Sequence, residues 1–520
     1  MIADFNEASS PHTFSTDICI IGSGAAALVM LSRLYTAGRQ VLVLEAGGEQ
    51  ITHENQQLYD VITPQHPLDG ARNGRFRVFG GSTTRWGGQA LPLDPLDFKQ
   101  RDWIPHSGWP ISYDTVAAYY PEVDRFLNVD PLGYDTDIYS LSGQPPLALD
   151  KDIQLRFSKW SPSPNLRNQY RDRINKSATI QLVKNANVMA LNLTPDGSSI
   201  QSLTIKNQVG RVGEVRAKQV VLACGGIENA RLLLVSNQQQ RCGVGNTRDI
   251  VGRFLQDHPN AEIGTLPTGA RSQQPYLNYF YVKQTRLLPR LFVAEDFLAQ
   301  KQLLNTNIYI QYQAGEHNAF DIAKTIYRRQ LQGNLSLQDV KLGLRLIRKL
   351  PQLVSTAKQY YLHRRVYIPQ AVARVDMIME TLPSPANRIE LSNDLDRLGM
   401  PKVVIKWQID PLVQRTMLEC TSLVKTHLER VGLGVLQENT WLSQGNWTEH
   451  IKDAKHHIGT TRMASSPREG VVNEDCRVHG IANLYVAGSS VFPTSGHSNP
   501  TATLLALALR LTDHLLALPK

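Results

Sequence analysis

A glycine-rich turn between two short apolar runs constrains this chain more than any other feature. The apolar run 17–21 is typical of a strand buried on both faces of a parallel sheet. It leads into Gly22-Ser23-Gly24-Ala25-Ala26-Ala27, a G-x-G-x-x-A turn, and a helical stretch follows at 28–37. A second apolar run at 41–44 ends at Glu45. This order predicts a βαβ unit of the Rossmann type that binds a dinucleotide.

Each part of this unit suits contact with a dinucleotide. Gly22 permits the tight turn, Gly24 lets backbone N–H groups reach a pyrophosphate, and the small Ala27 allows close packing of helix on strand. The helix N-terminus brings partial positive charge toward the phosphates. Glu45 can accept hydrogen bonds from ribose hydroxyls. The spacing does not separate FAD from NAD, but Glu45-Ala46-Gly47-Gly48 resembles the corresponding sequence of FAD-binding proteins.

Composition argues against several other classes of protein. The 520 residues allow roughly two to four domains. The net charge of +9 comes without a basic arm, an RNA-binding signature or a paired Cys/His finger, so we expect no nucleic-acid partner. The five cysteines lie far apart with no CxxC pair, which argues against a disulfide framework and against a metal site. We find neither a secretory leader nor an apolar run of membrane-spanning length, and we expect a cytoplasmic protein.

The positive charge is concentrated in one stretch. Residues 315–365 hold ten basic and three acidic side chains, so a tenth of the chain carries +7 of the net +9. Within it, four apolar residues recur at helical spacing with four basic residues between them: Leu337, Val340, Leu344 and Ile347, and Lys341, Arg345, Arg348 and Lys349. We favour a surface helix that packs on its own domain and turns its basic face to solvent. A contact of 324–365 with a membrane surface or a redox partner stays open.

Three further stretches, far apart in the chain, carry the remaining motifs. The first is Arg77-Val78-Phe79-Gly80-Gly81-Ser82-Thr83-Thr84-Arg85-Trp86-Gly87-Gly88, and the second runs over 220–234 around Gly225-Gly226. The third, 456–511, contains HHIGTTRM, NLYVAGSS and Asn499-Pro500-Thr501. In order and spacing they resemble the glucose–methanol–choline (GMC) oxidoreductase family over nearly the whole chain. The HxxGTTRM and NPT motifs resemble the branch with sugar and polyol dehydrogenases and pyranose oxidases.

The resemblance implies an α/β fold in which a Rossmann-like FAD-binding domain is combined with a discontinuous second domain. We expect this second α+β domain to bind the substrate and to be built on an antiparallel sheet, which alternating stretches such as 306–312 and 403–407 favour. Residues 380–388 resemble a strand of that domain. The expected boundaries are 14–130, 186–262 and 446–520 for the FAD-binding domain, 131–185 for a connector or cap, and 263–445 for the substrate-binding domain.

The residues expected to hold FAD lie in the glycine-rich turns and at the ends of the predicted strands. They are Gly22, Ser23, Gly24, Ala25, Ala26, Glu45, Ala46, Arg77, Gly80, Gly81, Ser82, Thr84, Trp86, Val188, Ala223, Gly225, Gly488, Ser489, Pro500 and Thr501. The apolar helix expected at 501–516 can point its N-terminus at the flavin ring and stabilise negative charge there. Some members of the family attach FAD through a His that precedes Trp. Arg85 stands at that position here, so we expect non-covalent FAD.

Oxidation of an alcohol by flavin needs a base, because a free alcohol is too weakly acidic to ionise at neutral pH. Histidine suits this task. His456 matches the catalytic His of the family's HxxGT motif, and His457 is the alternative under a one-residue slip. The partner position, His or Asn in the family, is Asn499, with His497 as its alternative. Asn499 can orient the substrate hydroxyl but cannot take its proton, so His456 would act as the single base.

Together these motifs predict oxidation of a CH–OH group of a sugar, a polyol or another small alcohol, by a dehydrogenase rather than an oxidase. Oxygen, a quinone or a redox protein would accept the electrons. Two other functions stay open, because fold does not imply function. One is a non-redox flavoprotein, since the family includes hydroxynitrile lyases. The other is a protein that keeps FAD as a structural element.

Overall fold

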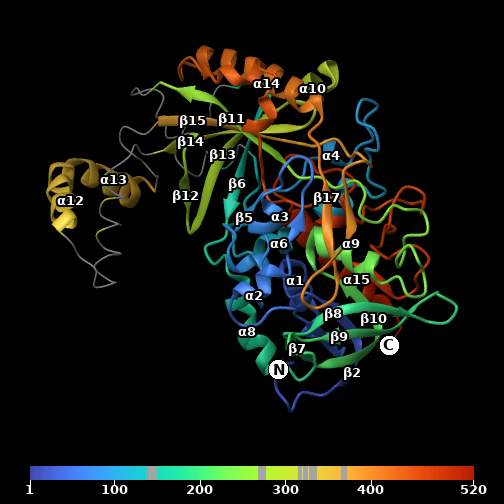
Figure 1. Cartoon of the computed structure of the whole chain (residues 1–520). Coiled ribbons are helices and arrows are strands. Elements are labelled where there is room, and N and C mark those ends of the chain that lie inside the picture. The colour runs from blue at the N-terminus through green and yellow to red at the C-terminus, as the bar shows by residue number, and fades with distance from the viewer. Residues whose placement is uncertain are drawn as a thin grey trace.

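Two large β-sheets and a small one form the framework of the part of the chain that the structure describes. The computed structural model describes residues 1–135, 149–267, 277–313, 337–364 and 372–519, with the single residues 138, 319, 322 and 326 between them. In Figure 1 the first sheet lies in the lower half, close to both chain ends, and the second sheet lies above it.

The first sheet contains the predicted βαβ unit. Its eight strands follow the order β1-β7-β3-β2-β10-β9-β8, and β20 pairs with the far end of β10. The strands are β1 (Ile2–Asp4), β2 (Thr13–Ile21), β3 (Val41–Leu44), β7 (Ile180–Lys184), β8 (Asn187–Leu193), β9 (Ile200–Lys206), β10 (Val212–Leu222) and β20 (Leu484–Val486). β2 runs parallel to β3 and β10, and β20 runs parallel to β10. The carboxyl ends of these four strands therefore lie along the same edge of the sheet.

Helices cover this sheet, and β3 and the carboxyl-terminal ends of β2 and β10 are accordingly apolar and buried. α1 (Ala25–Leu34) begins directly after the glycine turn, three residues earlier than expected, and packs against the C-terminal helix α15 (Thr501–Ala517). Seven of the ten residues of α1 are buried, as expected for a helix between a sheet and a second helix. Gly38 follows with a φ of 66°, a conformation that favours glycine, and the chain turns into β3.

The second sheet is antiparallel and has nine strands. Its order is β18-β11-β15-β14-β13-β6-β5, with β12 paired to β13 and β19 to β11. The strands are β5 (Gln89–Ala90), β6 (Ile153–Trp160), β11 (Pro259–Leu266), β12 (Phe280–Val282), β13 (Thr285–Val293), β14 (Thr306–Gln313), β15 (Val372–Met379), β18 (Gln437–Glu438) and β19 (Lys452–Asp453). α14 (Pro411–Arg430) covers one face of it, above the sheet in Figure 1, because Val413, Met417, Val424 and Leu428 recur on one helical face and are buried.

Two expectations about strands in the middle of the chain are wrong. The run at 403–407 belongs to β17 (Pro401–Lys406), which pairs with β16 (Arg388–Leu395) and β4 (Val61–Ile62) in the small sheet and not in the large antiparallel sheet. Residues 380–387 form a loop, and a strand begins only at Arg388. Pro383 and Pro385 lack the backbone N–H that a sheet ladder needs, which explains the loop.

The remaining helical elements connect the sheets. They are α2 (His53–Gln57), α3 (Gly70–Asn73), η1 (Gly81–Thr84), α4 (Pro95–Phe98), α5 (Tyr113–Ala117), α6 (Tyr120–Phe126), α8 (Leu166–Lys176), α9 (Gly225–Val235), α10 (Glu295–Lys301), α12 (Leu337–Arg348), α13 (Leu350–His363), η3 (Thr440–Ser443), η4 (Trp447–His450) and η5 (Ser489–Val491). Across the described ranges, none of these helices combines the length and apolar character needed to span a membrane.

The predicted fold class is confirmed in its main features, a mixed α/β fold with an antiparallel second sheet. The expected connector 131–185 supplies a strand to each sheet, since β6 lies in the second sheet and β7 in the first. The segment 136–148 of this connector lies outside the described residues, apart from Ile138. The domain boundaries themselves stay a prediction.

Candidate active site

A deep cavity lies at the edge of the first sheet where the four parallel strands end. Its volume is about 790 Å³, within the range of roughly 300–1,000 Å³ that is usual for ligand and cofactor sites. The turns that follow β2, β3, β10 and β20 all line it, through Gly24, Glu45, Gly225 and Gly488. Open α/β sheets bind ligands at such an edge. The structure thus brings the four glycine-rich or acidic turns of the sequence into one site.

At the floor of this cavity, glycines let the chain segments approach one another and leave the backbone accessible. A Cβ on Gly22, whose φ is 99°, would lie 2.5 Å from the carbonyl oxygen of Ala223, so β2 and β10 could not end as close together with any other residue there. A Cβ on Gly81 would lie 3.2 Å from the Cα of Gly24. A Cβ on Gly24 or Gly225 would meet no protein atom within 4 Å, and both residues line the cavity. Backbone N–H groups at these turns are therefore accessible to a ligand.

Three helices begin at the cavity. They are α1 after Gly24, α9 after Cys224 and α15 after Pro500, and the three N-cap residues make no side-chain cap hydrogen bond. The first N–H groups of a helix have no partner within the helix, and they carry partial positive charge. The cavity is therefore suited to anionic groups.

Glu45 lies at the end of β3 with part of its hydrogen-bonding capacity in use. Its Oε2 accepts from the backbone N–H and the Oγ–H of Ser23, at 3.1 and 2.5 Å, and its Oε1 accepts from the N–H of Gly47 at 2.7 Å. Burial raises the pKa of this carboxyl group, and the bonds from Ser23 and Gly47 oppose that shift. A carboxylate has about four acceptor positions, so Glu45 can accept one further bond from a ligand in the cavity that it lines.

Of the residues predicted from the sequence for the cofactor and for catalysis, all but Gly80 and Thr84 line the cavity. Gly80 lies behind the wall, where its N–H donates to the Oγ of Ser23 at 3.0 Å. The Thr84 hydroxyl donates to the carbonyl of Gly81 at 2.9 Å. Both residues fix the turn that carries Gly81 and do not face the cavity.

Sequence reasoning missed a group of charged residues at one end of the cavity. Arg75 pairs with Glu228 at 2.7 Å, and its guanidinium lies 4.1 Å from the ring centroid of Tyr59. Arg231 pairs with Asp396 at 2.8 Å. Burial alone would raise the pKa of Glu228, but the nearby Arg231, Arg75 and Arg77 lower it. Isolated arginines and acids carry no sequence motif, so only the fold could place them here.

The two predicted catalytic residues lie in contact, and a third residue joins them. The amide nitrogen of Asn499 lies 3.2 Å from Nε2 of His456. On the other side of the ring, Nδ1 of His456 lies 2.8 Å from Nδ1 of His258. Nε2 of His258 in turn lies 3.2 Å from the carbonyl oxygen of Ser495. His456 and Asn499 line the cavity, and His258 lies behind them.

This chain of contacts determines which nitrogen of His456 carries the proton. The Ser495 carbonyl can only accept, so Nε2 of His258 is the donor and, in a neutral ring, Nδ1 of His258 is the acceptor. Nδ1 of His456 must then donate to it, which leaves Nε2 of His456 unprotonated. The Asn499 amide donates to that same nitrogen. The unprotonated Nε2 of His456, which accepts from Asn499 in this structure, is therefore the ring nitrogen at the cavity.

Burial keeps both histidines of the pair neutral. It lowers the pKa of His258 to about 4. It also lowers the pKa of His456 well below 6.5, to which His258, His457 and Arg290 add. A neutral imidazole at physiological pH can accept a proton.

Two segments far apart in the chain hold the histidine pair together. The backbone of Gln256 and Ile458 exchanges two hydrogen bonds of 2.9 Å. The Asp257 carboxyl group accepts from the backbone N–H of His456 at 2.9 Å and of His258 at 2.7 Å. Burial raises the pKa of Asp257 to about 8, to which Asp453 adds. His258 was not predicted, because a short polar sequence at the start of a strand carries no recognisable motif.

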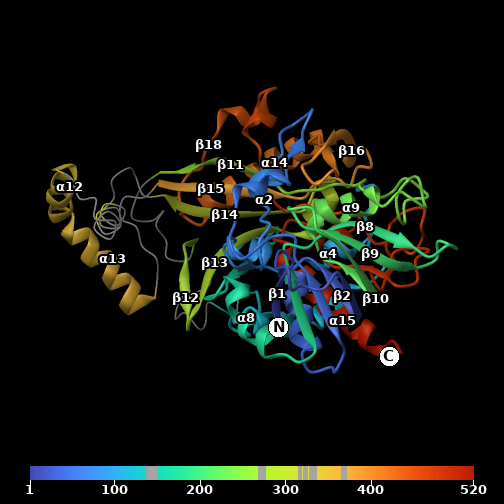
Figure 2. The same ribbon diagram turned by 60° about the horizontal axis from the view of Figure 1, so that its bottom comes forward.

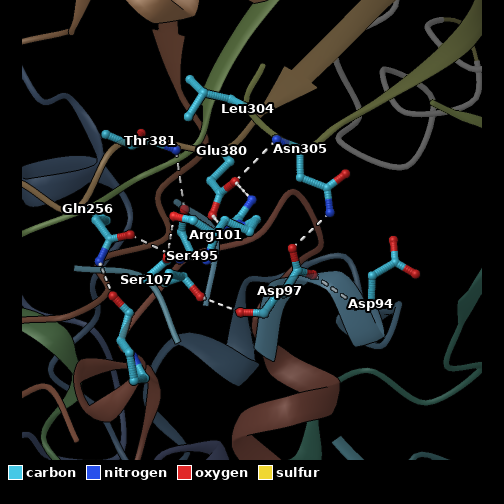
Figure 3. A network of polar contacts seen from close by, with 12 residues as sticks. Asp94, Asp97, Arg101, Ser107, Gln256, Leu304, Asn305, Glu380, Thr381 and Ser495 are labelled. Carbon is cyan, nitrogen blue, oxygen red and sulfur yellow. Dashed lines mark hydrogen bonds and ion pairs between the residues drawn. The ribbon is translucent and has the colours of Figure 1, made fainter. Parts of the chain in front are cut away.

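A buried polar network holds the loop at Ser495 in place (Figure 3). Gln256 donates to the carbonyl of Pro493 at 3.2 Å and accepts from the N–H of Ser495 at 2.9 Å. The backbone N–H of Thr381 donates to the Ser495 hydroxyl at 3.3 Å. These bonds leave the Ser495 carbonyl facing His258.

The same network ties this loop to the second sheet through an ion pair. Arg101 and Glu380 form two hydrogen bonds of 2.7 and 2.6 Å, and both side chains are almost completely buried. Asn305 donates its backbone N–H to Glu380 at 3.1 Å and its side-chain amide to Asp97 at 2.8 Å. Burial raises the pKa of Asp97 to about 6. The network therefore joins α4, the second sheet and the loop that carries Ser495 and Asn499.

The geometry favours the chosen residues over the two alternatives. His457 lines the cavity, but its ring makes no hydrogen bond through Nε2 to any described residue, and burial lowers its pKa to about 3. His497 is buried away from the cavity, where its Nε2 lies 2.9 Å from the Asp94 carboxylate. Neither ring contacts Asn499 through a hydrogen bond among the described residues. The roles of His456 and Asn499 stay predictions.

Comparison with known proteins agrees with this architecture. A family model described as GMC oxidoreductase matches residues 383–508. The chain is 25% identical to paromamine 6'-oxidase of Streptomyces fradiae, over 95% of this chain and 90% of that protein. It is 22% identical to the fructose dehydrogenase large subunit of Gluconobacter japonicus, over 98% and 99%. It is 24% identical to 2-methyl-1,2-propanediol dehydrogenase of Mycolicibacterium austroafricanum, over 96% and 95%.

Solved structures show the same fold. Pyridoxine 4-oxidase from Mesorbium loti superposes with a TM-score of 0.58 at 16% identity, over 96% of this chain and 99% of that chain. A crystal structure of formate oxidase superposes with a TM-score of 0.57 at 16% identity, over 97% and 99%. The family model covers the segment with His456 and Asn499, and the relatives align from end to end. Residues 383–508 thus carry the C-terminal domain of the GMC oxidoreductase family, a family of flavoproteins, and the whole chain is similar in sequence to the oxidase and the two dehydrogenases named above.

Proposed function

We propose that this protein oxidises a CH–OH group of a small polyhydroxylated compound, a sugar, a polyol or a related alcohol, to a carbonyl. A non-covalently bound FAD in the cavity supplies the acceptor for the hydride. The single observation that carries the proposal is the ordered chain from Ser495 through His258 and His456 to Asn499, because it presents one unprotonated imidazole nitrogen beside one amide at the cavity.

The cavity fits FAD in its shape and its charge. The three helix N-termini suit a pyrophosphate and a negatively charged ring, and Glu45 has capacity for a ribose hydroxyl. Gly24 and Gly225 leave room for close approach of the ligand to the backbone. Arg85 lines the cavity where a His would form a covalent link in some relatives, and arginine cannot form that link. This supports non-covalent binding.

In this proposal His456 takes the hydroxyl proton of the substrate at Nε2 as the C–H bond breaks. The base must be neutral before the reaction, and the low pKa of His456 meets that condition. The proton that it accepts makes the ring a cation, whose Nδ1–H stays hydrogen-bonded to His258. Asn499 holds the hydroxyl oxygen by hydrogen bonds and so aligns the C–H bond for transfer. It cannot compete for the proton.

The names of the relatives support this substrate class. Two of the relatives named above are dehydrogenases of fructose and of 2-methyl-1,2-propanediol, and both compounds carry more than one hydroxyl group. The names of the relatives include both oxidases and dehydrogenases, and we favour a dehydrogenase. A quinone or a redox protein would then accept the electrons in place of oxygen.

Anaerobic mixing of the purified flavoprotein with candidate alcohols tests the proposal. Loss of the oxidised flavin absorbance with a sugar, polyol or diol supports it, and the same titration with the His456→Ala variant serves as the control. A flavin that stays oxidised with every alcohol tested, while the protein cleaves or merely binds them, would favour a lyase or a structural flavoprotein instead. Turnover assays with an artificial dye and with oxygen then separate a dehydrogenase from an oxidase.

A further inference from the structure

The helical pair α12 and α13 stands away from the rest of the protein. Both views show it projecting beyond the second sheet, at the left of Figures 1 and 2. Four basic residues counted in the sequence at this stretch, Lys324, Arg328, Arg329 and Arg365, lie outside the described residues. The described residues 337–364 still carry six basic side chains and one acidic residue, Asp339, which is buried.

The apolar residues of this pair face solvent. In α13, Leu350, Val354, Ala357 and Tyr361 recur at the spacing of one helical face, and all four are exposed. Val354 is 64% exposed and Tyr361 is 75% exposed. A helix that packed on its own domain would turn such a face inward. α13 therefore turns an apolar face to solvent.

Two of the four α12 residues expected to pack on their own domain, Leu344 and Ile347, instead face solvent. Leu344 and Ile347 are 60% and 62% exposed. Lys341, Arg345 and Arg348 are also exposed and lie within four residues of Leu344. We call the exposed side chains of the pair the hairpin face; they combine apolar groups with positive charge alone, and they are Leu344, Ile347, Leu350, Val354, Ala357 and Tyr361 with Lys341, Arg345 and Arg348.

The base of the hairpin is anchored to the second sheet. The N–H of Tyr281 in β12 donates to the carbonyl of Arg364 at 2.8 Å, and the rings of Tyr281 and Tyr360 meet edge to face at 5.6 Å. Two residues earlier, Tyr279 meets the ring of Trp160 at 5.2 Å, and Trp160 lines the active-site cavity. The hairpin is therefore held in a fixed relation to the sheet that borders the cavity.

We propose that the hairpin face docks on the surface of an anionic lipid bilayer. Interfacial helices combine an apolar side that enters the acyl boundary with Lys and Arg side chains that reach the headgroups, and Tyr is favoured at that depth. The lack of an exposed acidic side chain in the described residues 337–364 makes the face complementary to anionic lipid. A second copy of this chain is a poor occupant, because a symmetric contact would bring six positive charges against six.

Cosedimentation of the holoenzyme with vesicles tests this docking. We expect binding to vesicles that contain phosphatidylserine and phosphatidylcholine, and far weaker binding to phosphatidylcholine alone. Because the screening length falls to about 3 Å in 1 M salt, high salt should remove most of the preference. Failure to bind the anionic vesicles at low salt would overturn the proposal.

Two sets of variants assign the binding to the hairpin face. The triple change Lys341→Gln, Arg345→Gln and Arg348→Gln should weaken partition roughly a hundredfold, since each basic residue near an anionic surface contributes a factor of about five. Its matched control removes the same charge elsewhere, from three exposed basic residues: Lys151→Gln, Lys176→Gln and Arg248→Gln.

The apolar part is tested by Val354→Ser with Tyr361→Ser, which should weaken partition by about tenfold per side chain. The control replaces the exposed Val209 and Val435 by Ser. Flavin content and turnover with a soluble acceptor should stay at the wild-type level in all four variants, which excludes misfolding.

Equal loss of binding in a hairpin variant and its control contradicts the assignment. A hairpin variant that changes only the sedimentation coefficient would identify the face as a contact between copies, and one that changes only binding to a redox protein would identify a protein dock.

Discussion

Replacement of His258 by Ala tests the central geometric argument, because this side chain does not line the cavity yet determines the tautomer of His456. In the wild-type protein, Nδ1–H of His456 donates to His258 at 2.8 Å. The Ala variant leaves this buried donor without its acceptor, which costs about 1–3 kcal/mol. The ring can avoid that cost by moving its proton to Nε2, and it then no longer presents a lone pair to the substrate.

The expected loss follows from that energy. A cost of about 1–3 kcal/mol corresponds to a fall in kcat/KM of roughly 5- to 150-fold, which is smaller than the effect of removing His456 itself. The loss should appear in the rate of anaerobic flavin bleaching, with unchanged flavin content. His258→Asn is the matched control, because its Oδ1 can accept from Nδ1–H of His456, and it should recover most of the activity.

The pH profile separates this positioning role from a merely structural one. Neutral His456 is the active form, so the rate falls as pH decreases through its pKa, and burial together with His258 holds that pKa well below 6.5. Removal of His258 takes away one cause of the low value. The acidic limb of the kcat/KM profile should therefore move to higher pH in His258→Ala. Wild-type bleaching rates and an unshifted acidic limb in this variant would refute the reasoning.

Three further predictions concern the base, the cofactor and the framework. His456→Ala should keep bound flavin but lose turnover by roughly 10²–10⁴-fold, the usual range for a lost acid–base group, and full steady-state activity would remove the assignment. Acid precipitation should release the yellow cofactor into the supernatant, whereas a coloured pellet would show a covalent link. Arg101→Ala should lower the free energy of unfolding by about 3–5 kcal/mol, because it leaves Glu380 charged and buried. In the same urea titration, Lys99→Ala should change that energy by less than about 1 kcal/mol, since its pair with Glu295 is exposed; similar values for the two variants would contradict the argument.

The glycine turn shows which elements the local sequence can predict. Gly22, Gly24 and the apolar runs around them predicted a strand, a turn, a helix and a second strand, and the structure has these elements within a few residues of the expected positions. Such a unit can be predicted from sequence, because the backbone geometry of the turn and the burial of the strands on both faces allow few residue types at these positions. A strand does form at 401–406 but in the small sheet, because alternation alone does not say which strand is the partner. Residues 380–387, where the family resemblance predicted a strand, form a loop instead, because Pro383 and Pro385 lack the N–H that a sheet ladder needs.

The α12 and α13 region shows the limit of periodicity in another way. Helical spacing predicted a helix around Leu344 and Ile347, and a helix is present. The direction in which its apolar side chains point depends on what lies beside the helix. Sequence spacing holds no information about that neighbour, so the exposure of these side chains appeared only in the structure.

The sequence by itself determined the βαβ unit, because its residue types have a local physical purpose, and it predicted the cavity-lining turns. Through the family resemblance it also predicted His456 and Asn499, which the structure brings into contact. Only the tertiary structure decided that His258, 198 residues away from His456, sets its tautomer. It also decided that Arg75, Glu228 and Asp396 line the cavity. The proton on a histidine ring follows the donor or acceptor that meets its second nitrogen in space, and chain folding, not local sequence, supplies that partner.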